Sequence, residues 1–317
     1  MRLTARPSTA TVRRLALASV AANCAIVVTG GLVRLTGSGL GCPTWPECVP
    51  GSYTPVVEQP QGYHKQVEFG NRLLTFVVGV VAIAVLVAVV RHLRRTDGPR
   101  RLAVLAAAPL LGVVAQAVLG GVTVLTGLSP ATVAAHFLLS MVLVAASTVL
   151  LLAVVAPQPA LAVRRELSWL VTALALVAAV VLVLGTVVTG SGPHSGDADT
   201  PARFGLDPRS ASWLHADAVW LFVGLVAALL FALRLTDAPA VARRRGVRLL
   251  VVTLLQGVVG YVQYATDLPV LLVVLHMLGA SLLVVAVTAT VLAVRGTPGG
   301  SLLAEPHPGA AVPLTTA

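Results

Sequence analysis

Eight long apolar runs dominate this sequence of 317 residues. A helix of about 20 residues is needed to cross the hydrocarbon core of a bilayer, which is about 30 Å thick. Because backbone N–H and C=O groups find no partner in lipid, such runs must form helices rather than isolated strands. We therefore expect eight transmembrane helices, at residues 14–34, 68–90, 102–125, 132–156, 167–189, 211–233, 248–266 and 270–294.

The composition places the chain in the same class. Hydrophobic residues make up 57% of it and charged residues only 11%, whereas soluble proteins carry about 25% charge. We predict an all-α integral membrane protein. The net charge of +10 does not indicate nucleic acid as a partner, because most of the 22 basic residues fall on one side of the predicted helices. The positive-inside rule then predicts cytoplasmic N- and C-termini in the cell membrane, with basic segments against anionic lipid. The basic residues predicted outside are Arg34, Lys65, Arg72, Arg203 and Arg209.

The sequence contains an internal repeat. Residues 116–140 align with residues 256–280 at a constant offset, and the tetrapeptide TGSG occurs at 36–39 and again at 189–192. Since four helices return the chain to its starting side, the two copies run in the same sense. We expect two pseudo-symmetric four-helix bundles. The predicted segments are a cytoplasmic N-terminus (1–13), an N-terminal half (14–156) with an outer loop (35–67), a cytoplasmic linker (157–166), a C-terminal half (167–294) and a disordered cytoplasmic tail (295–317).

Three histidines lie inside predicted spans. His136, His215 and His276 each fall five or six residues into an even-numbered helix. At about 1.5 Å rise per residue, the three imidazoles lie at nearly one depth, and Glu68 and Asn71 begin the second helix at a similar level. Ionisable side chains within a bundle mark functional sites. The pattern favours a metal or haem site, and separate hydrogen bonds to neighbouring helices are the alternative.

The distribution of these histidines favours haem over zinc. A zinc ion needs three or four ligands close together, whereas here one imidazole comes from each of three helices. Two imidazoles on facing helices, as predicted for His215 and His276, suit the two axial positions of a b-type haem. Aligning the halves matches His276 with His136 and His215 with Asn71. The first half therefore has one histidine next to a carboxylate, Glu68, which is an arrangement suited to chemistry.

Two of the three cysteines, Cys42 and Cys48, lie in the first outer loop. A disulfide is plausible there because that compartment is oxidising. A structural link, two free thiols and a redox-active pair are all open. Cys24 lies within the first helix and is expected to be a small core residue.

The motifs together resemble those of the haem A synthase family. They are "GGLVRLTGSGLGCPTWPEC" at 30–48, "VEFGNRLL" at 67–74, "TGSGPHSGD" at 189–197 and single histidines in the fourth, sixth and eighth helices. The resemblance spans about residues 13–295. It implies an eight-helix membrane enzyme that oxidises the C8 methyl group of haem O to a formyl group by successive hydroxylations with water-derived oxygen. It further implies a resident haem b in the C-terminal half and a substrate site in the N-terminal half.

By position, the resemblance implies a role for each of several residues. His215 and His276 would be the axial ligands of haem b, and His136 a ligand of the substrate haem iron. Glu68 would be the catalytic carboxylate, and Cys42 and Cys48 the outer-loop pair.

The chain departs from the family pattern in two places. Many members have histidine where this chain has Asn71, so either His64 supplies a second iron ligand or His136 acts alone. The second outer loop has His194 in place of a cysteine pair. Basic groups available for haem propionates are Arg34, Arg72, Arg203 and Lys65.

Two other functions are weighed against this one. A b-type electron-transfer cytochrome with two haems would need two histidines in each half. A transporter would need broken helices and a pocket at mid-membrane. Expected partners are haem O and haem A, a haem O synthase, oxidase assembly factors and the lipid membrane; a homo-oligomer is open.

Overall fold

The computed structural model describes residues 9–96, 100–155, 165–197, 199–236 and 238–297. Over these ranges the chain forms eight α-helices and no strand longer than an isolated bridge. The all-helical class predicted from the sequence is confirmed. The helices are α1 (Thr9–Leu35), α2 (His64–Thr96), α3 (Arg101–Leu125), α4 (Pro130–Val155), α5 (Arg165–Ser191), α6 (Pro208–Leu235), α7 (Ala240–Ala265) and α8 (Val270–Arg295).

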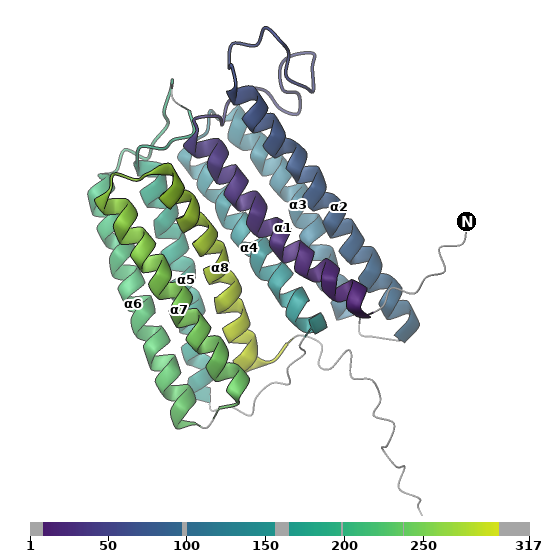
Figure 1. The fold of residues 1–317 in the computed structure, drawn as a ribbon, viewed down its shortest axis with the longest axis vertical. Helices are drawn as coiled ribbons and strands as arrows, with labels where there is room; N and C mark the ends of the chain where they lie inside the picture. Colours follow the sequence, from purple (N-terminus) through teal and green to yellow (C-terminus); the bar gives the residue numbers. More distant parts are fainter. Residues whose placement is uncertain (1–8, 97–99, 156–164, 198, 237, 298–317) are drawn as a thin grey trace, which may run out of the picture.

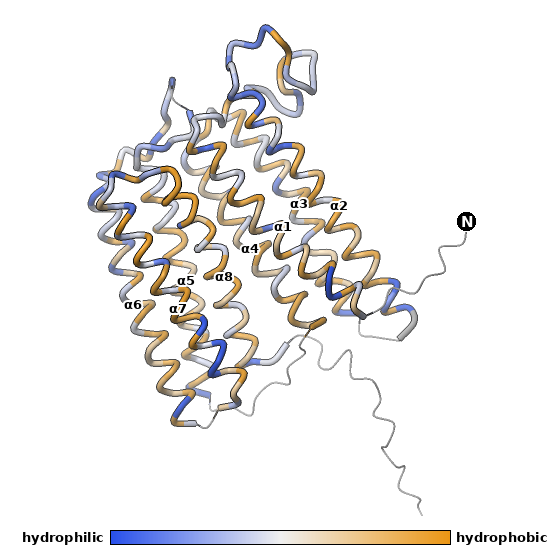
Figure 2. The backbone as a smooth tube through the Cα atoms, in the orientation of Figure 1, coloured by the Kyte–Doolittle hydropathy of each residue, from blue (hydrophilic) through white to orange (hydrophobic). Residues whose placement is uncertain are grey.

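All eight helices are long and apolar enough to cross a membrane. Hydrophobic residues cover the lengths of the helices, and hydrophilic residues gather at their ends and in the loops (Figure 2). Large apolar side chains such as Phe76, Val80, Leu111 and Leu176 are exposed along these helices. In water such a surface would be a liability, whereas lipid solvates it. The chain is therefore a multi-pass membrane protein.

Contacts between helices form two closed rings. α1, α2, α3 and α4 touch in order and α4 returns to α1, while α5, α6, α7 and α8 do the same and α8 returns to α5. The rings meet where α8 contacts α1 and α4, and where α4 contacts α5 (Figure 1). This is the contact pattern that two four-helix halves would have. The pseudo-symmetry between them stays a prediction.

Polar side chains hold α1 against α4. The hydroxyls of Ser19 and Ser147 are hydrogen-bonded at 3.3 Å, and Asn23 Nδ2 donates to the same Ser147 hydroxyl at 3.3 Å. All three residues are buried. Because lipid gives helices no hydrophobic reason to associate, such bonds and close packing hold the bundle. The free thiol of Cys24 lies in the adjacent buried cluster with Val284 of α8, which confirms it as a core residue.

Several helices extend beyond the predicted boundaries, because a helix does not end where its apolar run ends. α7 begins at Ala240 rather than at residue 248, and α2 begins at His64 rather than at residue 68. Arg165 and Glu166, predicted in the linker, are the first residues of α5. The rest of the linker (157–164), residues 1–8 of the N-terminus and residues 298–317 of the tail lie outside the described residues.

The loops at one end of the bundle pack against each other; we call this the loop end, and it holds residues 36–63, 126–129 and 192–207. Trp45 lies on α3 so closely that a Cβ on Gly121 would be 2.3 Å from its indole. The N–H of Gly39 donates to the carbonyl of Gly196 at 2.9 Å, which joins the α1–α2 loop to the α5–α6 loop. Leu128 contacts both of these glycines.

The contact between Trp45 and Gly121 gives a testable prediction. Gly121→Ala should displace the indole and loosen the α1–α2 loop, whose two cysteines are completely buried. We expect the disulfide in that loop to be reduced several-fold faster by a water-soluble phosphine, as measured by alkylation and mass spectrometry. Gly224→Ala, where an added Cβ meets nothing within 4 Å, is the control. Equal reduction rates in the two variants would show that the indole does not hold the loop.

Candidate functional site

A large cavity opens among helices of both halves. Its volume is about 2340 Å³, well above the roughly 300–1,000 Å³ of a site for one small ligand. His136, His215 and His276 all line it, as do Glu68 and Asn71. The structure therefore places these five predicted site residues around one space. That space is large enough for two bulky ligands.

Each of the three histidines lies against a glycine of the preceding helix. A Cβ built on Gly120 would lie 3.2 Å from Cε1 of His136, and the corresponding distances are 3.3 Å for Gly185 to His215 and for Gly260 to His276. Any side chain at these glycines would press the imidazole into the cavity. We call the three contacts glycine cradles. The sequence showed the glycines but could not tell them from ordinary packing glycines.

The ring nitrogens of these histidines are poorly satisfied within the protein. Nδ1 of His136, His215 and His276 is buried without a hydrogen-bond partner among the described residues. The Val181 carbonyl lies near the His215 ring but makes no hydrogen bond of normal geometry. Buried polar atoms without partners are costly. These Nδ1 atoms lie on the side of each ring next to its glycine, 3.7–3.8 Å from the built Cβ, while the rings themselves line the cavity.

Glutamines that the sequence analysis left without a role fix two of the histidine-bearing turns. Gln116 Nε2 of α3 donates to the His136 carbonyl at 3.0 Å, and Gln256 Nε2 of α7 donates to the His276 carbonyl at 2.8 Å. Each bond ties the backbone of the histidine to the helix that carries its cradle glycine. Gln116 and Gln256 occupy equivalent positions in the two copies of the repeat, and this equivalence was the signal in the sequence that could have identified them. The repeat is thus visible in hydrogen bonds as well as in residue identities.

The fourth position around the cavity is occupied by Asn71. Its Oδ1 accepts a hydrogen bond from Thr29 Oγ1 at 2.8 Å, and its Nδ2 lies 3.9 Å from a Cβ built on Gly30. His64 does not line the cavity, because its Nδ1 is bonded to Ser38 Oγ at 2.8 Å in the loop end. In this conformation His64 therefore does not replace the histidine that α2 lacks.

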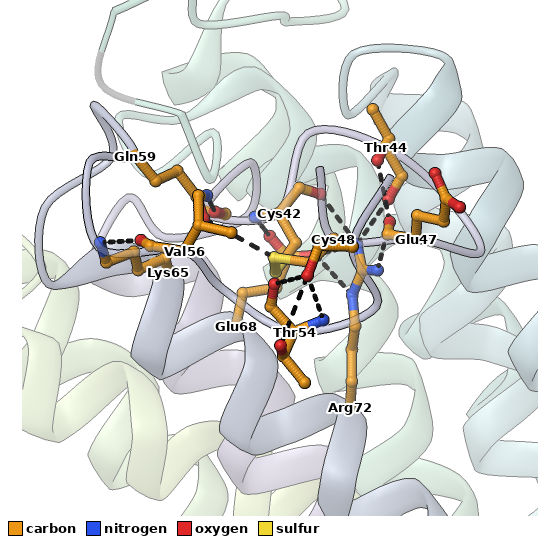
Figure 3. The surroundings of a disulfide bond; sticks show 12 residues. Cys42, Thr44, Glu47, Cys48, Thr54, Val56, Gln59, Lys65, Glu68 and Arg72 are labelled. Atoms are coloured by element: carbon orange, nitrogen blue, oxygen red, sulfur yellow. Dashed lines mark hydrogen bonds and ion pairs between the residues drawn. A yellow bond between two sulfur atoms is a disulfide. The ribbon is translucent and has the colours of Figure 1, made fainter. Parts of the chain in front are cut away.

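Glu68 and Arg72 form a partly buried ion pair that holds the α1–α2 loop (Figure 3). Arg72 Nη2 and Nε donate to Glu68 Oε1 at 2.6 and 3.0 Å. The N–H of Cys42 donates to Glu68 Oε2 at 2.7 Å. Arg72 also donates to three loop carbonyls, those of Cys42, Thr44 and Glu47. We call these bonds the loop clamp; they involve both oxygens of Glu68.

Cys42 and Cys48 form a disulfide, which confirms the pairing that the sequence made plausible. Both residues are fully buried. Gln59 covers them, since its Nε2 donates to the Gly41 carbonyl and its Oε1 lies 3.9 Å from Cys48 Sγ. Because Cys42 also donates to Glu68, the disulfide and the carboxylate belong to one bonded unit at the edge of the cavity.

The basic residues predicted outside differ in their hydrogen-bond partners. Arg72 is bound in the loop clamp, and Lys65 Nζ donates to the carbonyls of Val56 and Val57. Arg34 and His194 line the cavity, as Arg72 and Arg209 do, and take no part in the clamp. Burial, followed by the charges of Arg34 and Arg203, lowers the pKa of the His194 imidazole. His194 is therefore a neutral neighbour of two cations at pH 7.

The residues fit a haem-like macrocycle better than a compact ion. In the described part of the chain, no three His, Cys, Asp or Glu side chains gather where they could hold one metal ion. Instead, single imidazoles come from separate helices, each beside a glycine. His215 and His276 line the cavity from the C-terminal half, and His136 lines it from the N-terminal half. The assignment of one haem to each half stays a prediction.

The loop clamp makes a prediction about stability. Glu68→Gln and Arg72→Gln should each loosen the loop, because charge-assisted hydrogen bonds contribute about 1.5–3 kcal/mol. We expect a lower melting temperature in detergent and faster disulfide reduction in both variants, by similar amounts. Arg209→Gln is the control, since this outer arginine stacks on Trp213 and takes no part in the clamp. If both clamp variants matched the wild type, these bonds would not hold the loop.

Comparison with known proteins agrees with this architecture. The profile of a family described as cytochrome oxidase assembly protein matches residues 13–196, more than half of the chain. A protein of Lysinibacillus sphaericus named heme A synthase is 35% identical over 145 residues, which are 44% of this chain and 43% of that relative. One of Halalkalibacterium halodurans with the same name is 28% identical over 223 residues, 66% of this chain and 72% of the relative. One of Geobacillus kaustophilus, also so named, is 39% identical over 70 residues, 22% and 20%. The chain thus covers less than half of the first and third of these relatives, and by its family match it belongs to the cytochrome oxidase assembly proteins.

Proposed function

We propose that this protein is a haem A synthase, an oxidoreductase that converts the C8 methyl group of haem O to a formyl group. The observation that carries the proposal is the repeated glycine cradle, which directs three imidazoles from α4, α6 and α8 toward one large cavity. The names of the similar proteins support the same activity. The membrane setting suits a hydrophobic porphyrin.

The C-terminal half is proposed to hold a resident haem b. His215 and His276 come from α6 and α8, which lie diagonally across the ring of helices in that half, and both imidazoles line the cavity. A haem bound by two imidazoles supplies electron transfer rather than ligand chemistry. The cradle glycines Gly185 and Gly260 would leave the imidazoles the room to turn toward the iron.

The N-terminal half is proposed to bind the substrate haem O through His136. Asn71 stands where a fourth histidine would be, and its amide is already bonded to Thr29. We propose that the substrate iron takes one protein ligand, His136. A single firm ligand suits a haem that enters as substrate and leaves as product.

The reaction needs oxygen from water and removes electrons and protons. Converting the methyl group and one water to a formyl group releases four protons and four electrons. Glu68 borders the cavity and is proposed to stabilise positive charge at the reacting carbon and to accept protons. The adjacent Cys42–Cys48 disulfide is a group of this chain that can take up two electrons and two protons at a time.

Glu68 is more than a helix-end carboxylate in this structure. An exposed ion pair at this helical spacing contributes about 0.3–0.5 kcal/mol, whereas the pair of Glu68 and Arg72 is partly buried and joined to the loop backbone. A structural role and a catalytic role therefore coexist as hypotheses for the same side chain. Arg72, which shares the clamp, provides the means to separate them.

The rival functions have less support. All eight helices run without interruption over their described residues, which gives no sign of the broken helices of a transporter. The two-haem electron-transfer cytochrome lacks its fourth histidine at Asn71. We propose cytoplasmic termini, with the loop end outside, and partners that supply haem O and receive haem A. A haem O synthase and oxidase assembly factors fit those roles.

The resident haem is tested by removing its proposed ligands. His215→Ala and His276→Ala should each abolish the low-spin haem b spectrum of the purified protein, because the other cavity-lining imidazole of that half, His194, lies in the α5–α6 loop rather than inside a helix. His136→Ala should retain haem b while losing haem A formation. His92→Ala, at the other end of α2 and away from the cavity, is the control. A normal haem b spectrum in both His215→Ala and His276→Ala would contradict the assignment.

The role of Glu68 is tested against its clamp partner. Glu68→Gln should keep haem b but lose at least tenfold in haem A formation, with haem O or an alcohol intermediate accumulating, as measured by chromatography of extracted pigments. Arg72→Gln should loosen the loop equally but lose less activity, because the carboxylate remains. If the two variants lost the same activity at the same disulfide accessibility, Glu68 would act only through the clamp.

A further inference from the structure

Arg34 ends α1 in an unusual environment for an arginine. Its Nη2 donates to the backbone carbonyl of Thr189 in α5 at 2.8 Å. Its Nε is buried and has no hydrogen-bond partner among the described residues. Within the same residues, the one salt bridge joins Arg72 to Glu68, so no acidic side chain neutralises Arg34. A guanidinium this enclosed without an anion is costly.

The surroundings of Arg34 are cationic rather than acidic. His194 lies on the same cavity wall, and Arg203 acts on both groups electrostatically. Among the described residues Arg203 has no carboxylate partner either, and its Nη2 donates to the Pro193 carbonyl at 3.1 Å. The carbonyl of a peptide accepts a hydrogen bond but does not cancel the charge. The arrangement is therefore that of a site for an anion.

The position of Arg34 relates it to one half of the cavity. Thr189 lies four residues after Gly185, about 6 Å along α5, and its hydroxyl donates to the Gly185 carbonyl at 2.8 Å. Gly185 forms the cradle of His215. Arg34 thus lies about one helical turn from the level of that imidazole. It comes from the N-terminal half and is bonded to the C-terminal half.

We propose that Arg34 binds a carboxylate of the porphyrin held by His215 and His276. This inference rests on the proposed function, and it assigns one of four candidate basic residues to one ligand. A carboxylate would satisfy Nε and the charge at once, because guanidinium binds carboxylate through paired N–H groups. Arg203 adds to the positive potential there. The N-terminal half would thereby help to retain the haem of the C-terminal half.

The experiment compares two probes on the full-length purified protein after haem removal. The probes are haemin and haemin dimethyl ester, which has the same ring but no carboxylates. Binding is followed by the bis-imidazole absorption spectrum. Wild type should prefer haemin, and Arg34→Gln should weaken haemin binding about tenfold or more while leaving ester binding unchanged. Arg34→Lys should recover part of the preference, since it restores the charge without the fork.

The control is Arg234→Gln, an exposed arginine at the opposite end of α6, which should bind both probes as wild type does. An unchanged preference for haemin in Arg34→Gln would overturn the proposal. So would normal retention of haem b together with a raised KM for haem O, because the carboxylate would then belong to the substrate. Failure of the wild type to give a bis-imidazole spectrum with either probe would refute the resident haem itself, which is a different result.

Discussion

Close approach between a histidine and a glycine on the neighbouring helix is the interaction on which this site depends. At three places the odd-numbered helix has no side chain where the imidazole of the even-numbered helix lies against it. The absence of a Cβ sets the distance between the two helices and the direction of the ring together. At two of the three places a glutamine one turn away fixes the histidine backbone as well. Cavity shape and ligand direction therefore come from the same few contacts.

The loop end also helps to position the side chains of the site. The Arg72 guanidinium is bonded to one side chain and three backbone carbonyls of the α1–α2 loop. Through Glu68 and Cys42 the same group reaches the disulfide. A charged pair in a membrane protein is expensive unless each atom is satisfied, and here the loop backbone supplies the missing partners. The position of the carboxylate beside the cavity is therefore a product of loop folding.

Much of the architecture could be predicted from the sequence. Eight helices follow from hydropathy, and the shared level of His136, His215 and His276 follows from their equal depth in three helices. The start of α7 could not be found in this way, because hydropathy changes at the arginines near residue 245 whereas helical hydrogen bonding does not. The hydrogen bond from the Cys42 N–H to Glu68 could not be predicted for a related reason. Cys42 belongs to a loop, and a loop has no periodic pattern that would place its backbone.

The glycine cradles could not be predicted from the sequence, for a different reason. Gly120 and Gly260 were visible in the repeat, but whether a glycine faces a histidine or a lipid chain depends on the rotation of one helix against the next. Side-chain spacing within one helix carries no such information. Asn71 was identifiable as the odd member of the set, since the alignment of the halves places it opposite His215. The hydrogen bond between Asn71 and Thr29 could not be predicted, because Thr29 belongs to another helix.

The contacts of α1 have a consequence for how the molecule is made. Of the eight described helices, α1 leaves the ribosome before the other seven and α8 after them, yet the two pack together, with Met277 lying against Gly31. A partner that arrives about 250 residues later cannot guide the early steps of insertion. Until then, the face of α1 that α8 will cover must rest against lipid or an insertion factor. The eight-helix assembly is completed only after α8 has been synthesised.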